Sequence, residues 1–284
     1  MAKKKIRDDI NIKAVILTFL EICNDFNAPT SMVWIERAII DLMTTTWVVP
    51  CYNEAERWST EYWTKLLDTT DFHWIFVDDG STDSTFQMIS DIQSKKVSLL
   101  RLPQNVGKSE ALRIGLVSAS ESNSDYLGFM DADGAFLEND LKTIEQYAKQ
   151  LVFQKNVNMV WGSRVALAGH DIQRTHTRHY LGRIVNTFVM WGIDVSIYDT
   201  QCGLKLFYND KYFQKSLNFK TRTRWFFDLE IYSQFAKENL TRPNVVEYPL
   251  QSWREIPGSK ISISKFPSIF REIIYIRNIM KTVK

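Results

Sequence analysis

A short β-prone run passes directly into an acidic turn in the stretch Tyr126-Leu127-Gly128-Phe129-Met130-Asp131-Ala132-Asp133-Gly134. The same order occurs earlier, where Trp74–Val77 leads into Asp78-Asp79-Gly80-Ser81. Further β-prone runs are present at Trp47–Val49, Val97–Leu100 and Val157–Trp161. Segments of helical character follow the first four runs, at Glu54–Leu67, Ser84–Gln93, Lys108–Ser118 and Glu138–Gln150. Because strands alternate with helices, the sequence predicts an α/β fold with a mostly parallel central sheet flanked by helices.

The two ends of the chain differ from this alternating region. Before it, Ile10–Asp25 and Met32–Met43 have helix-compatible apolar spacing and are separated by Asn27-Ala28-Pro29. We therefore expect an N-terminal helical extension over residues 1–45 and one larger domain over residues 46–284. After about residue 165 the pattern becomes irregular and more basic, and it closes with a helix near Ile263–Lys281.

Length and charge exclude several classes of protein. The 284 residues include 35 Lys and Arg against 33 Asp and Glu, a net charge of +2, so we expect no nucleic-acid partner. No run reaches the roughly 18 apolar residues that a membrane-spanning helix needs, and the start does not resemble a secretory signal. Three widely spaced cysteines fit a reducing compartment. These observations predict a cytoplasmic protein.

The acidic turns at Asp78-Asp79 and Asp131-Ala132-Asp133 have a common place in the predicted sheet. In open α/β sheets, ligands bind at the edge formed by the carboxyl ends of the strands. Two carboxylates at such an edge can share a hard divalent cation, Mg²⁺ or Mn²⁺, together with substrate phosphates. Asp and Gly are also common in turns that bind nothing. Two such turns at strand ends of one sheet favour a metal- and phosphate-binding site.

Two other phosphate-binding motifs are incomplete. Asn105-Val106-Gly107-Lys108-Ser109 has the last residues of a P-loop, but the glycine required five residues before Gly107 is replaced by Leu102. The first strand lacks a GxGxxG turn and continues into Pro50-Cys51-Tyr52-Asn53-Glu54 instead. The sequence therefore excludes a P-loop protein and a nicotinamide-binding Rossmann domain.

Taken together, these motifs resemble those of family 2 glycosyltransferases. The stretches that carry the likeness are Val49–Glu54, Val77–Ser81, Asn105–Lys108, Asp131–Asp133, Gly162–Arg164, Asp199–Lys205, Arg224–Asp228 and Gly258–Lys260. The later ones are similar to the dolichyl-phosphate (polyprenyl-phosphate) β-glucosyltransferase branch. The likeness runs from about Trp47 to Met280 and leaves the first 45 residues uncovered. It implies a fold of the nucleotide-diphospho-sugar transferase (GT-A) type.

The resemblance also implies a UDP-sugar site. The residues it assigns to that site are Pro50, Tyr52, Glu54, Asp78, Asp79, Lys108, Asp131, Ala132, Asp133, Arg164, Arg254 and Lys260. Within this set, Asp131 and Asp133 would bind Mg²⁺ or Mn²⁺. Many relatives have a glutamine as third metal ligand two residues after the second aspartate, whereas this chain has Ala135.

The implied reaction is an inverting transfer of a hexose, glucose by branch resemblance, from a UDP-sugar to a polyprenyl or dolichyl phosphate. Arg174, Arg178 and Arg183 are the expected cations for the acceptor phosphate, and a solvated helix face is the equally weighted alternative. A phosphate oxygen is already ionised near neutral pH. Such a transfer therefore relies on positioning and electrostatic stabilisation more than on a strong base.

Asp199 and Asp228 are the carboxylates expected near the reacting sugar. They would orient hydroxyl groups or act as base, and the alternative is that they only form ion pairs with Arg224 and Lys205. If the acceptor is instead a glycan hydroxyl, Asp228 would have to serve as base. A third possibility is a homologue that binds nucleotide-sugar without turnover, and retention of Asp131 and Asp133 argues against it.

The closing segment Phe266–Lys281 is basic and amphipathic. An interfacial helix of this kind would bury its Ile and Phe side chains in lipid while Arg and Lys meet headgroups. Packing of the same face against the sheet is the alternative. The first possibility implies an enzyme that binds peripherally to the cytoplasmic face of a membrane.

Overall fold

The computed structural model describes residues 39–155, 157–191, 197–239, 243–256 and 266–282. The chain divides between Met43 and Thr44 into two units, and the fold described below is that of the second, Thr44–Lys284. The predicted helix at Ile10–Asp25 lies outside the described residues, as does most of the one predicted at Met32–Met43.

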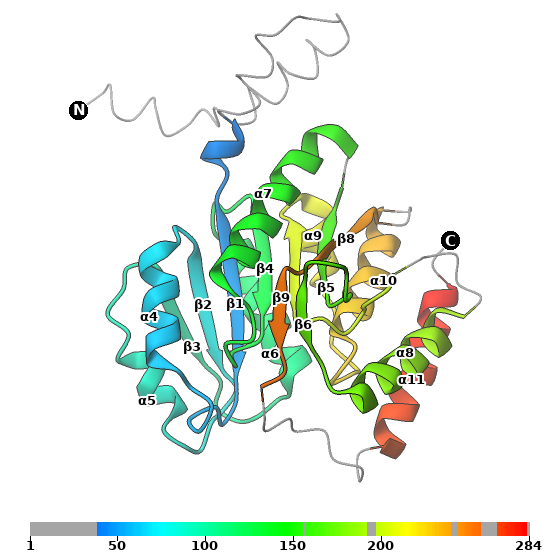
Figure 1. Ribbon diagram of the computed structural model, residues 1–284, viewed down its shortest axis with the longest axis horizontal. Helices are drawn as coiled ribbons and strands as arrows, with labels where there is room; N and C mark the ends of the chain where they lie inside the picture. Colours follow the sequence, from blue (N-terminus) through cyan, green and yellow to red (C-terminus); the bar gives the residue numbers. More distant parts are fainter. Residues whose placement is uncertain (1–38, 156, 192–196, 240–242, 257–265, 283–284) are drawn as a thin grey trace, which may run out of the picture. The chain divides into compact units, whose positions relative to one another are not determined.

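Seven strands of the described residues form one sheet, in the order β3-β2-β1-β4-β7-β5-β8 (Figure 1). Their bounds are β1 (Thr45–Cys51), β2 (His73–Asp78), β3 (Val97–Arg101), β4 (Tyr126–Met130), β5 (Met159–Ser163), β7 (Leu204–Tyr208) and β8 (Val245–Pro249). Strand β7 pairs antiparallel with β4 and β5, and the other pairs are parallel. Two further strands, β6 (Asp171–Gln173) and β9 (Ser252–Arg254), form a separate parallel pair. The predicted mostly parallel sheet is confirmed.

Helices flank this sheet, as predicted (Figure 1). Their bounds are α4 (Thr60–Thr69), α5 (Thr85–Ser90), α6 (Lys108–Ser120), α7 (Glu138–Lys155), α8 (His176–Met190), α9 (Lys211–Ser216), α10 (Phe227–Asn239) and α11 (Phe266–Lys281). Helix α4 begins later than the segment predicted from Glu54. The reason is a capping residue, because Ser59 Oγ accepts a hydrogen bond from Tyr62 N at 3.2 Å and fixes the start of the helix.

The core lies on both faces of the sheet. Every residue of β4 is buried, as expected for a parallel strand covered by helices on both sides. Helix α6 packs on β1, β2 and β4 and buries Ala111, Leu112, Leu116 and Ala119 to 1% exposure or less. Complete burial of a leucine side chain stabilises the folded state by about 1.5–3 kcal/mol. This packing holds the ends of the parallel strands at fixed positions.

The region after Val165, which the sequence shows only as irregular, is regular in the structure: it contains β6 to β9 and α8 to α10. The expectation was wrong because β6 and β9 are three-residue, partly exposed strands. In addition, Lys205 interrupts the apolar pattern of β7 although its side chain is fully buried. The predicted closing helix is present as α11, which packs against α8 and α10. Of the helices described, none combines the length and the apolar character needed to span a bilayer.

Candidate active site

The acidic turns meet at one edge of the sheet because of its topology. Strands β1, β2 and β4 run parallel, so the turns after them lie at the same edge. Strand β7 runs in the opposite direction between β4 and β5, and its first residue therefore starts at that edge. The amide of Asp131 donates to the carbonyl of Gly203 at 3.2 Å. Segments that are far apart in the sequence, 131–133 and 199–203, are thus neighbours.

The turn after β2 is organised by its two aspartates. Asp79 is buried and accepts hydrogen bonds from the amides of Val106, at 2.7 Å, and Gly107, at 2.9 Å. Burial raises the pKa of Asp79, and these two hydrogen bonds oppose the shift. Asp78 is fully buried, and its Oδ1 accepts from the amide of Ser81 at 3.0 Å. Both aspartates therefore shape the loops around the predicted nucleotide pocket.

The turn after β1 is tied to the turn after β2. The amide of Glu54 donates to Thr85 Oγ1 at 2.8 Å, and the Glu54 carboxylate pairs with Arg57. Arg57 Nη1 also lies 3.9 Å from Asp133 Oδ2. Glu54 thus sits between the two strand ends, and its partner Arg57 extends towards the turn after β4. Pro50 and Tyr52, the other predicted residues of this turn, are half-buried.

Asp131 and Asp133 form an acidic pair after β4. Burial raises the pKa of Asp133 to about 6, and the neighbouring charge of Asp131 adds to the shift. The Lys108 ammonium donates to Asp131 Oδ1 at 2.5 Å. A Cβ atom at residue 203 would lie 2.3 Å from Asp131 Oδ2, so a glycine there leaves room for the carboxylate. Ala132, between the two aspartates, is buried.

This pair fits a hard divalent cation, because two carboxylates that repel each other are stabilised by a shared positive ion. In the described part of the chain, no position is surrounded by three or more His, Cys, Asp or Glu side chains. At the position where many relatives have glutamine, the Ala135 amide donates to Asp133 Oδ1 at 3.2 Å. Magnesium and manganese commonly complete their coordination with substrate phosphates and water. Two protein carboxylates are therefore enough to hold such an ion when substrate phosphates and water supply the other ligands.

Asp199 forms an ion pair with Arg164. Two nitrogens of the guanidinium donate to its carboxylate, Nε at 2.7 Å and Nη2 at 2.8 Å, and the Arg164 amide donates at 3.0 Å. Burial alone would raise the pKa of Asp199, but the Arg164 charge and these bonds outweigh it and hold the pKa well below its usual range. The carboxylate therefore stays ionised and fixes the Arg164 side chain.

Asp228 is paired in a similar way with Lys205. The Lys205 ammonium, which is fully buried, lies 2.9 Å from Asp228 Oδ2 and donates to the carbonyls of Thr200 and Cys202 at 3.1 and 2.6 Å. Burial raises the pKa of Asp228, and Lys205 opposes the shift. Lys205 thereby connects α10, which carries Asp228, to the turn before β7.

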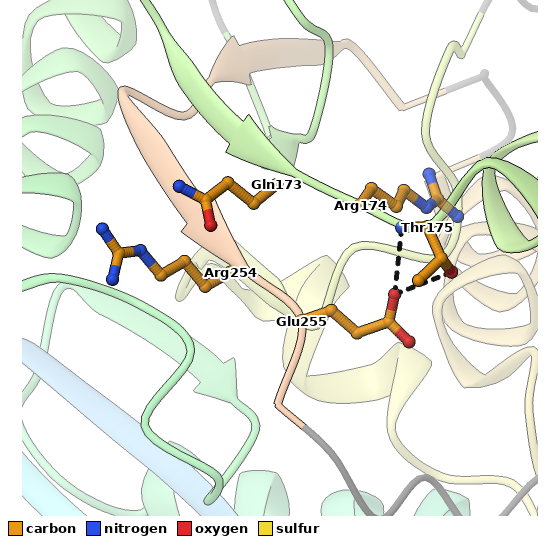
Figure 2. Close-up of a pocket in the computed structure, with 5 residues that line it drawn as sticks. All are labelled: Gln173, Arg174, Thr175, Arg254 and Glu255. Atoms are coloured by element: carbon orange, nitrogen blue, oxygen red, sulfur yellow. Dashed lines mark hydrogen bonds between the residues drawn. The ribbon is translucent and has the colours of Figure 1, made fainter.

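A pocket of about 360 Å³ lies where β6 and β9 meet the start of α8 (Figure 2). It is lined by Gln173, Arg174, Thr175, Arg254 and Glu255. Glu255 Oε2 accepts from the amide and hydroxyl of Thr175, at 3.2 and 3.0 Å. Figure 2 shows Arg254 and Gln173 directed to one side of the strand pair and Arg174 to the other. Two predicted site residues, Arg174 and Arg254, thus border one pocket from different directions.

Arg174 lies near both positive and negative side chains. Burial lowers the pKa of its guanidinium, and the nearby charge of Arg164 lowers it further, whereas the charges of Asp199 and Glu255 oppose the shift. The guanidinium packs over α8, where a Cβ at residue 182 would lie 2.8 Å from Arg174 Nη2. Arg174 and Arg164 are thus two neighbouring guanidinium groups, and Asp199 is paired with Arg164.

Of the predicted site residues, Arg183 lies away from the pocket, and Lys260 and the side chain of Arg178 are not described. Arg183 stacks on the Tyr198 ring, 4.0 Å from its centroid, and donates to the Tyr198 carbonyl at 3.0 Å. Lys260 lies outside the described residues, and the side chain of Arg178 is likewise not described. Arg254 is 70% exposed, and its nearest carboxylate oxygen, on Asp171, is 3.7 Å away.

The structure places Arg224 beside the predicted nucleotide pocket. Its side chain lies 3.8 Å from where a Cβ of residue 107 would be, and its charge lowers the pKa of Asp79 against the larger effect of burial. The amides of Arg224 and Trp225 donate to Glu272 Oε2 of α11, at 3.0 and 3.2 Å. Arg224 and Asp228 are the two ends of one sequence motif, but the resemblance implies a site role for Asp228 only. Glu272 is the single carboxylate in the sequence of α11, which is the one feature of the sequence that distinguishes it.

The chain is similar to several known proteins. Residues 46–235 match the family described as glycosyl transferase family 2. A dolichyl-phosphate beta-glucosyltransferase of Trichomonas vaginalis is 31% identical over 261 residues, which are 84% of this chain and 74% of the relative. The enzyme of the same name from Homo sapiens is 32% identical over 232 residues, 75% of this chain and 68% of the relative.

Solved structures resemble the fold. Glucosyl-3-phosphoglycerate synthase from Mycobacterium tuberculosis, in complex with Mn²⁺, UDP-glucose and phosphoglyceric acid, has a TM-score of 0.58 and 13% identity, covering 91% of this chain and 86% of its own. A mycobacterial protein has a TM-score of 0.60 and 15% identity, covering 91% and 81%. At such identities the likeness concerns the fold alone, and it confirms the predicted GT-A type.

Proposed function

The chain belongs to glycosyl transferase family 2, and from this premise we propose that it transfers glucose with inversion from UDP-glucose to a dolichyl or polyprenyl phosphate. The names of its relatives, dolichyl-phosphate beta-glucosyltransferases, support both the sugar and the acceptor. The observation that carries the proposal is the arrangement of charges at the sheet edge. The acidic pair Asp131 and Asp133 adjoins the turn before β7, and that turn is bonded to Arg164, beside Arg174.

The donor is assigned to the ends of β1, β2 and β4. Uridine would bind between the turns that contain Glu54 and Asp79, with Arg224 beside them. Asp131 and Asp133 would bind Mg²⁺ or Mn²⁺, whose charge neutralises the departing diphosphate when the ion is bound. The M. tuberculosis synthase crystallised with Mn²⁺ and UDP-glucose supports a divalent ion in this fold. Lys260, matched by motif alone, is assigned to the same diphosphate.

The acceptor phosphate is assigned to the corner beside Arg174, with Arg178 as a further cation, and Arg254, which is directed to the other side of the strand pair, stays assigned to the donor. One phosphate oxygen attacks the anomeric carbon from the side opposite the diphosphate. The bond from that carbon to the UDP oxygen breaks, and its electron pair leaves with UDP. No proton has to be removed from an ionised phosphate, so positioning and electrostatic stabilisation suffice.

The ion pairs favour a phosphate acceptor over a glycan hydroxyl. A hydroxyl acceptor needs a base, and Asp228 would have to be free to take a proton. The ammonium of Lys205, 2.9 Å from Asp228 Oδ2, occupies that oxygen of the carboxylate and opposes the rise in the pKa of Asp228 that burial causes. We therefore assign Asp199 and Asp228 to positioning Arg164 and the turn before β7.

The proposed location is the cytoplasmic side of a membrane, with peripheral contact. The three widely spaced cysteines of the sequence support a reducing compartment, and the two that the structure describes, Cys51 and Cys202, are buried. The exposed aromatic side chains of Tyr180 and Trp191 at α8 and the basic, amphipathic sequence of α11 support contact with a membrane surface.

The decisive experiment offers labelled UDP- and GDP-sugars to the purified protein with polyprenyl phosphate and Mg²⁺ or Mn²⁺. We expect a lipid-soluble product from UDP-glucose only. Product from a different donor would overturn the assignment of the sugar, and no lipid-soluble product from any donor would overturn the acceptor. Asp133→Asn should lower the rate by about 10²-fold or more, whereas the exposed control Asp68→Asn should not change it. Full activity of Asp133→Asn would remove the metal role.

A further inference from the structure

Lys108 is the first residue of α6, and its ammonium contacts one of the two carboxylates proposed to bind the divalent ion. Its Nζ lies 2.5 Å from Asp131 Oδ1. In the part of the chain that the structure describes, no second carboxylate lies within 4.0 Å of this ammonium. The partial positive charge at the N-terminus of a helix disfavours a cation there. The attraction of Asp131, and not the helix, therefore accounts for the place of the Lys108 side chain.

The carboxylate of Asp131 has little space around it. A Cβ at residue 203 would lie 2.3 Å from Oδ2 and 2.8 Å from Oδ1, so the turn before β7 covers one side of the carboxylate. The ammonium of Lys108 lies on Oδ1. A divalent ion that binds Asp131 must therefore come close to this ammonium. Because like charges at short distance repel each other, the ion and the ammonium compete for Asp131.

Asp133, the other proposed ligand, has a cation that is held in place. Arg57 Nη1 lies 3.9 Å from Asp133 Oδ2, which is beyond hydrogen-bond distance. Arg57 forms its own ion pair with Glu54. The Arg57 side chain is 20% exposed, whereas that of Lys108 is 41% exposed. Arg57 is thus anchored beside the site, and Lys108 is the cation with room to move.

Lys108 also adjoins the predicted nucleotide pocket. It follows Gly107, whose amide donates to Asp79 at 2.9 Å. Lysine is a common partner of phosphate groups in proteins. A diphosphate bound at the ends of β2 and β4 would offer the Lys108 ammonium a second anion, and it would also supply oxygen ligands to a divalent ion. One side chain therefore borders both the proposed metal site and the proposed nucleotide site.

We propose that Lys108 couples the binding of the divalent ion to the binding of the nucleotide. Without nucleotide, the ammonium competes for Asp131 and keeps the affinity for the ion low. With UDP bound, the ammonium turns to the diphosphate and leaves Asp131 to the ion. By thermodynamic linkage, the ion raises the affinity for UDP by the same factor as UDP raises the affinity for the ion. The inference rests on the proposed function, since it takes UDP as the nucleotide and Asp131 as a metal ligand.

This role can be distinguished from two simpler ones by the sign of one effect. Loss of a residue that only binds phosphate leaves the affinity for the ion alone unchanged. Loss of a residue that only supports the fold lowers that affinity. Loss of a competing cation raises it. A gain in affinity for the ion on removal of Lys108 is therefore the diagnostic result.

The test measures the binding of Mn²⁺ to the full chain by electron paramagnetic resonance, with and without saturating UDP and with no acceptor present. The values are corrected for the complex that UDP and Mn²⁺ form in buffer. For the wild-type protein, UDP should lower the Kd for Mn²⁺ at least about tenfold. Lys108→Met should bind Mn²⁺ alone about tenfold more tightly than wild type, and its coupling factor should be at least about threefold smaller.

Two further variants serve as controls. Lys108→Arg keeps the positive charge, so its Kd for Mn²⁺ alone should stay within about threefold of wild type. Lys142→Met removes a lysine with nearly the same local setting, since Lys142 Nζ lies 2.6 Å from Glu138 Oε1 and the side chain is 43% exposed. Lys142 is not among the predicted site residues, and its substitution should change neither the Kd for Mn²⁺ nor the coupling.

Two results would overturn the proposal. One is an affinity for Mn²⁺ alone in Lys108→Met that equals or falls below that of the wild type. The other is a wild-type protein whose affinity for Mn²⁺ does not depend on UDP. If Lys108→Met melts well below the wild-type temperature, Lys108→Gln takes its place in the measurement with the same expected gain.

Binding and transfer separate this proposal from the proposed function. If the wild-type protein shows the coupling and transfers no glucose to polyprenyl phosphate, the assignment of the acceptor fails and the role of Lys108 stands. If the protein transfers glucose and Lys108→Met gains no affinity for Mn²⁺, the proposed function stands and the role of Lys108 fails.

Discussion

The two halves of the sheet, β1–β4 on one side and β5, β7 and β8 on the other, differ in the groups that bind their acidic side chains. On the side of β1–β4, Asp79 accepts hydrogen bonds from the amides of the loop that follows β3. On the side of β5, β7 and α10, Asp199 and Asp228 pair with the charged side chains of Arg164 and Lys205. On the proposed donor side, Asp79 is thus held by neutral amides, although Glu54 and Asp131 also pair with Arg57 and Lys108. On the proposed acceptor side, both carboxylates are held by buried ion pairs.

This difference has an energetic consequence. Loss of a carboxylate that is bonded to amides removes hydrogen bonds, at a cost of about 1–3 kcal/mol. Loss of one member of a buried ion pair also leaves an uncompensated charge, at a cost of about 3–5 kcal/mol. The acceptor side should therefore tolerate single substitutions less well, and its two carboxylates cannot be altered independently of their partners.

The strongest test is Lys205→Met, which leaves Asp228 buried without its cation. We expect the free energy of unfolding at neutral pH to fall by about 3–5 kcal/mol, measured by urea denaturation. The deficit should shrink as pH falls. Burial raises the pKa of Asp228 in the folded protein, so protonation stabilises the folded state more than the unfolded one. Adding Asp228→Asn to Lys205→Met should restore part of the loss, and no restoration would contradict the pairing.

Asp79→Ala is the matched change on the donor side. It removes two backbone hydrogen bonds and no ion-pair partner. The expected loss is about 2 kcal/mol, smaller than that of Lys205→Met, together with weaker UDP binding measured by calorimetry. A loss as large as that of Lys205→Met would remove the distinction between the two sides.

The same difference explains what the sequence could predict. Strands β1, β2 and β4 each contain a short apolar run, and acidic turns follow β2 and β4, so their order alone places Asp79 and Asp131 at one sheet edge. In β7 a buried lysine breaks the apolar pattern. In β6 and β9 the strands are too short and too exposed to be seen.

The ion pairs of the site could not be predicted from the sequence for another reason. Arg164 and Asp199 are 35 residues apart, and only the antiparallel insertion of β7 between β4 and β5 brings them together. Spacing in the sequence does not reveal that insertion. The motif resemblance selected Arg164 and Asp199 for separate roles, because it supplied positions without their contacts.

Glu110 of α6 connects the two sides, which gives a test by pH. Its carboxylate accepts from Arg113 at 2.6 Å and from Thr221 Oγ1, on the segment before α10, at 2.9 Å. Burial would raise its pKa, but these bonds outweigh it and lower the pKa below the ordinary value of 4.5. The stabilisation is therefore present above pH 4.5 and is lost as pH falls through the folded pKa.

Glu110→Gln should accordingly cost about 1 kcal/mol at pH 7, and the difference from wild type should disappear in acid. Denaturation at several pH values checks this expectation. The exposed carboxylate Glu121 is the control, and Glu121→Gln should stay within about 0.5 kcal/mol of wild type. If Glu110→Gln lowers the free energy of unfolding equally at every pH, the packing of residue 110 and not its charge connects the two sides.

The smallest expected effect concerns Glu272, through which α11 holds the segment before α10. Glu272→Gln keeps an oxygen that can accept from the amides of Arg224 and Trp225, so it should cost only about 0.5 kcal/mol. Glu272→Ala removes the acceptor and should cost about 1 kcal/mol. Because Arg224 lies beside Gly107 and acts on Asp79, the alanine variant should also raise the KM for UDP-glucose, while the glutamine variant leaves it near wild type. If both variants leave KM unchanged, the helix proposed to touch the membrane has no connection to the donor pocket, and the two sides of the sheet work independently.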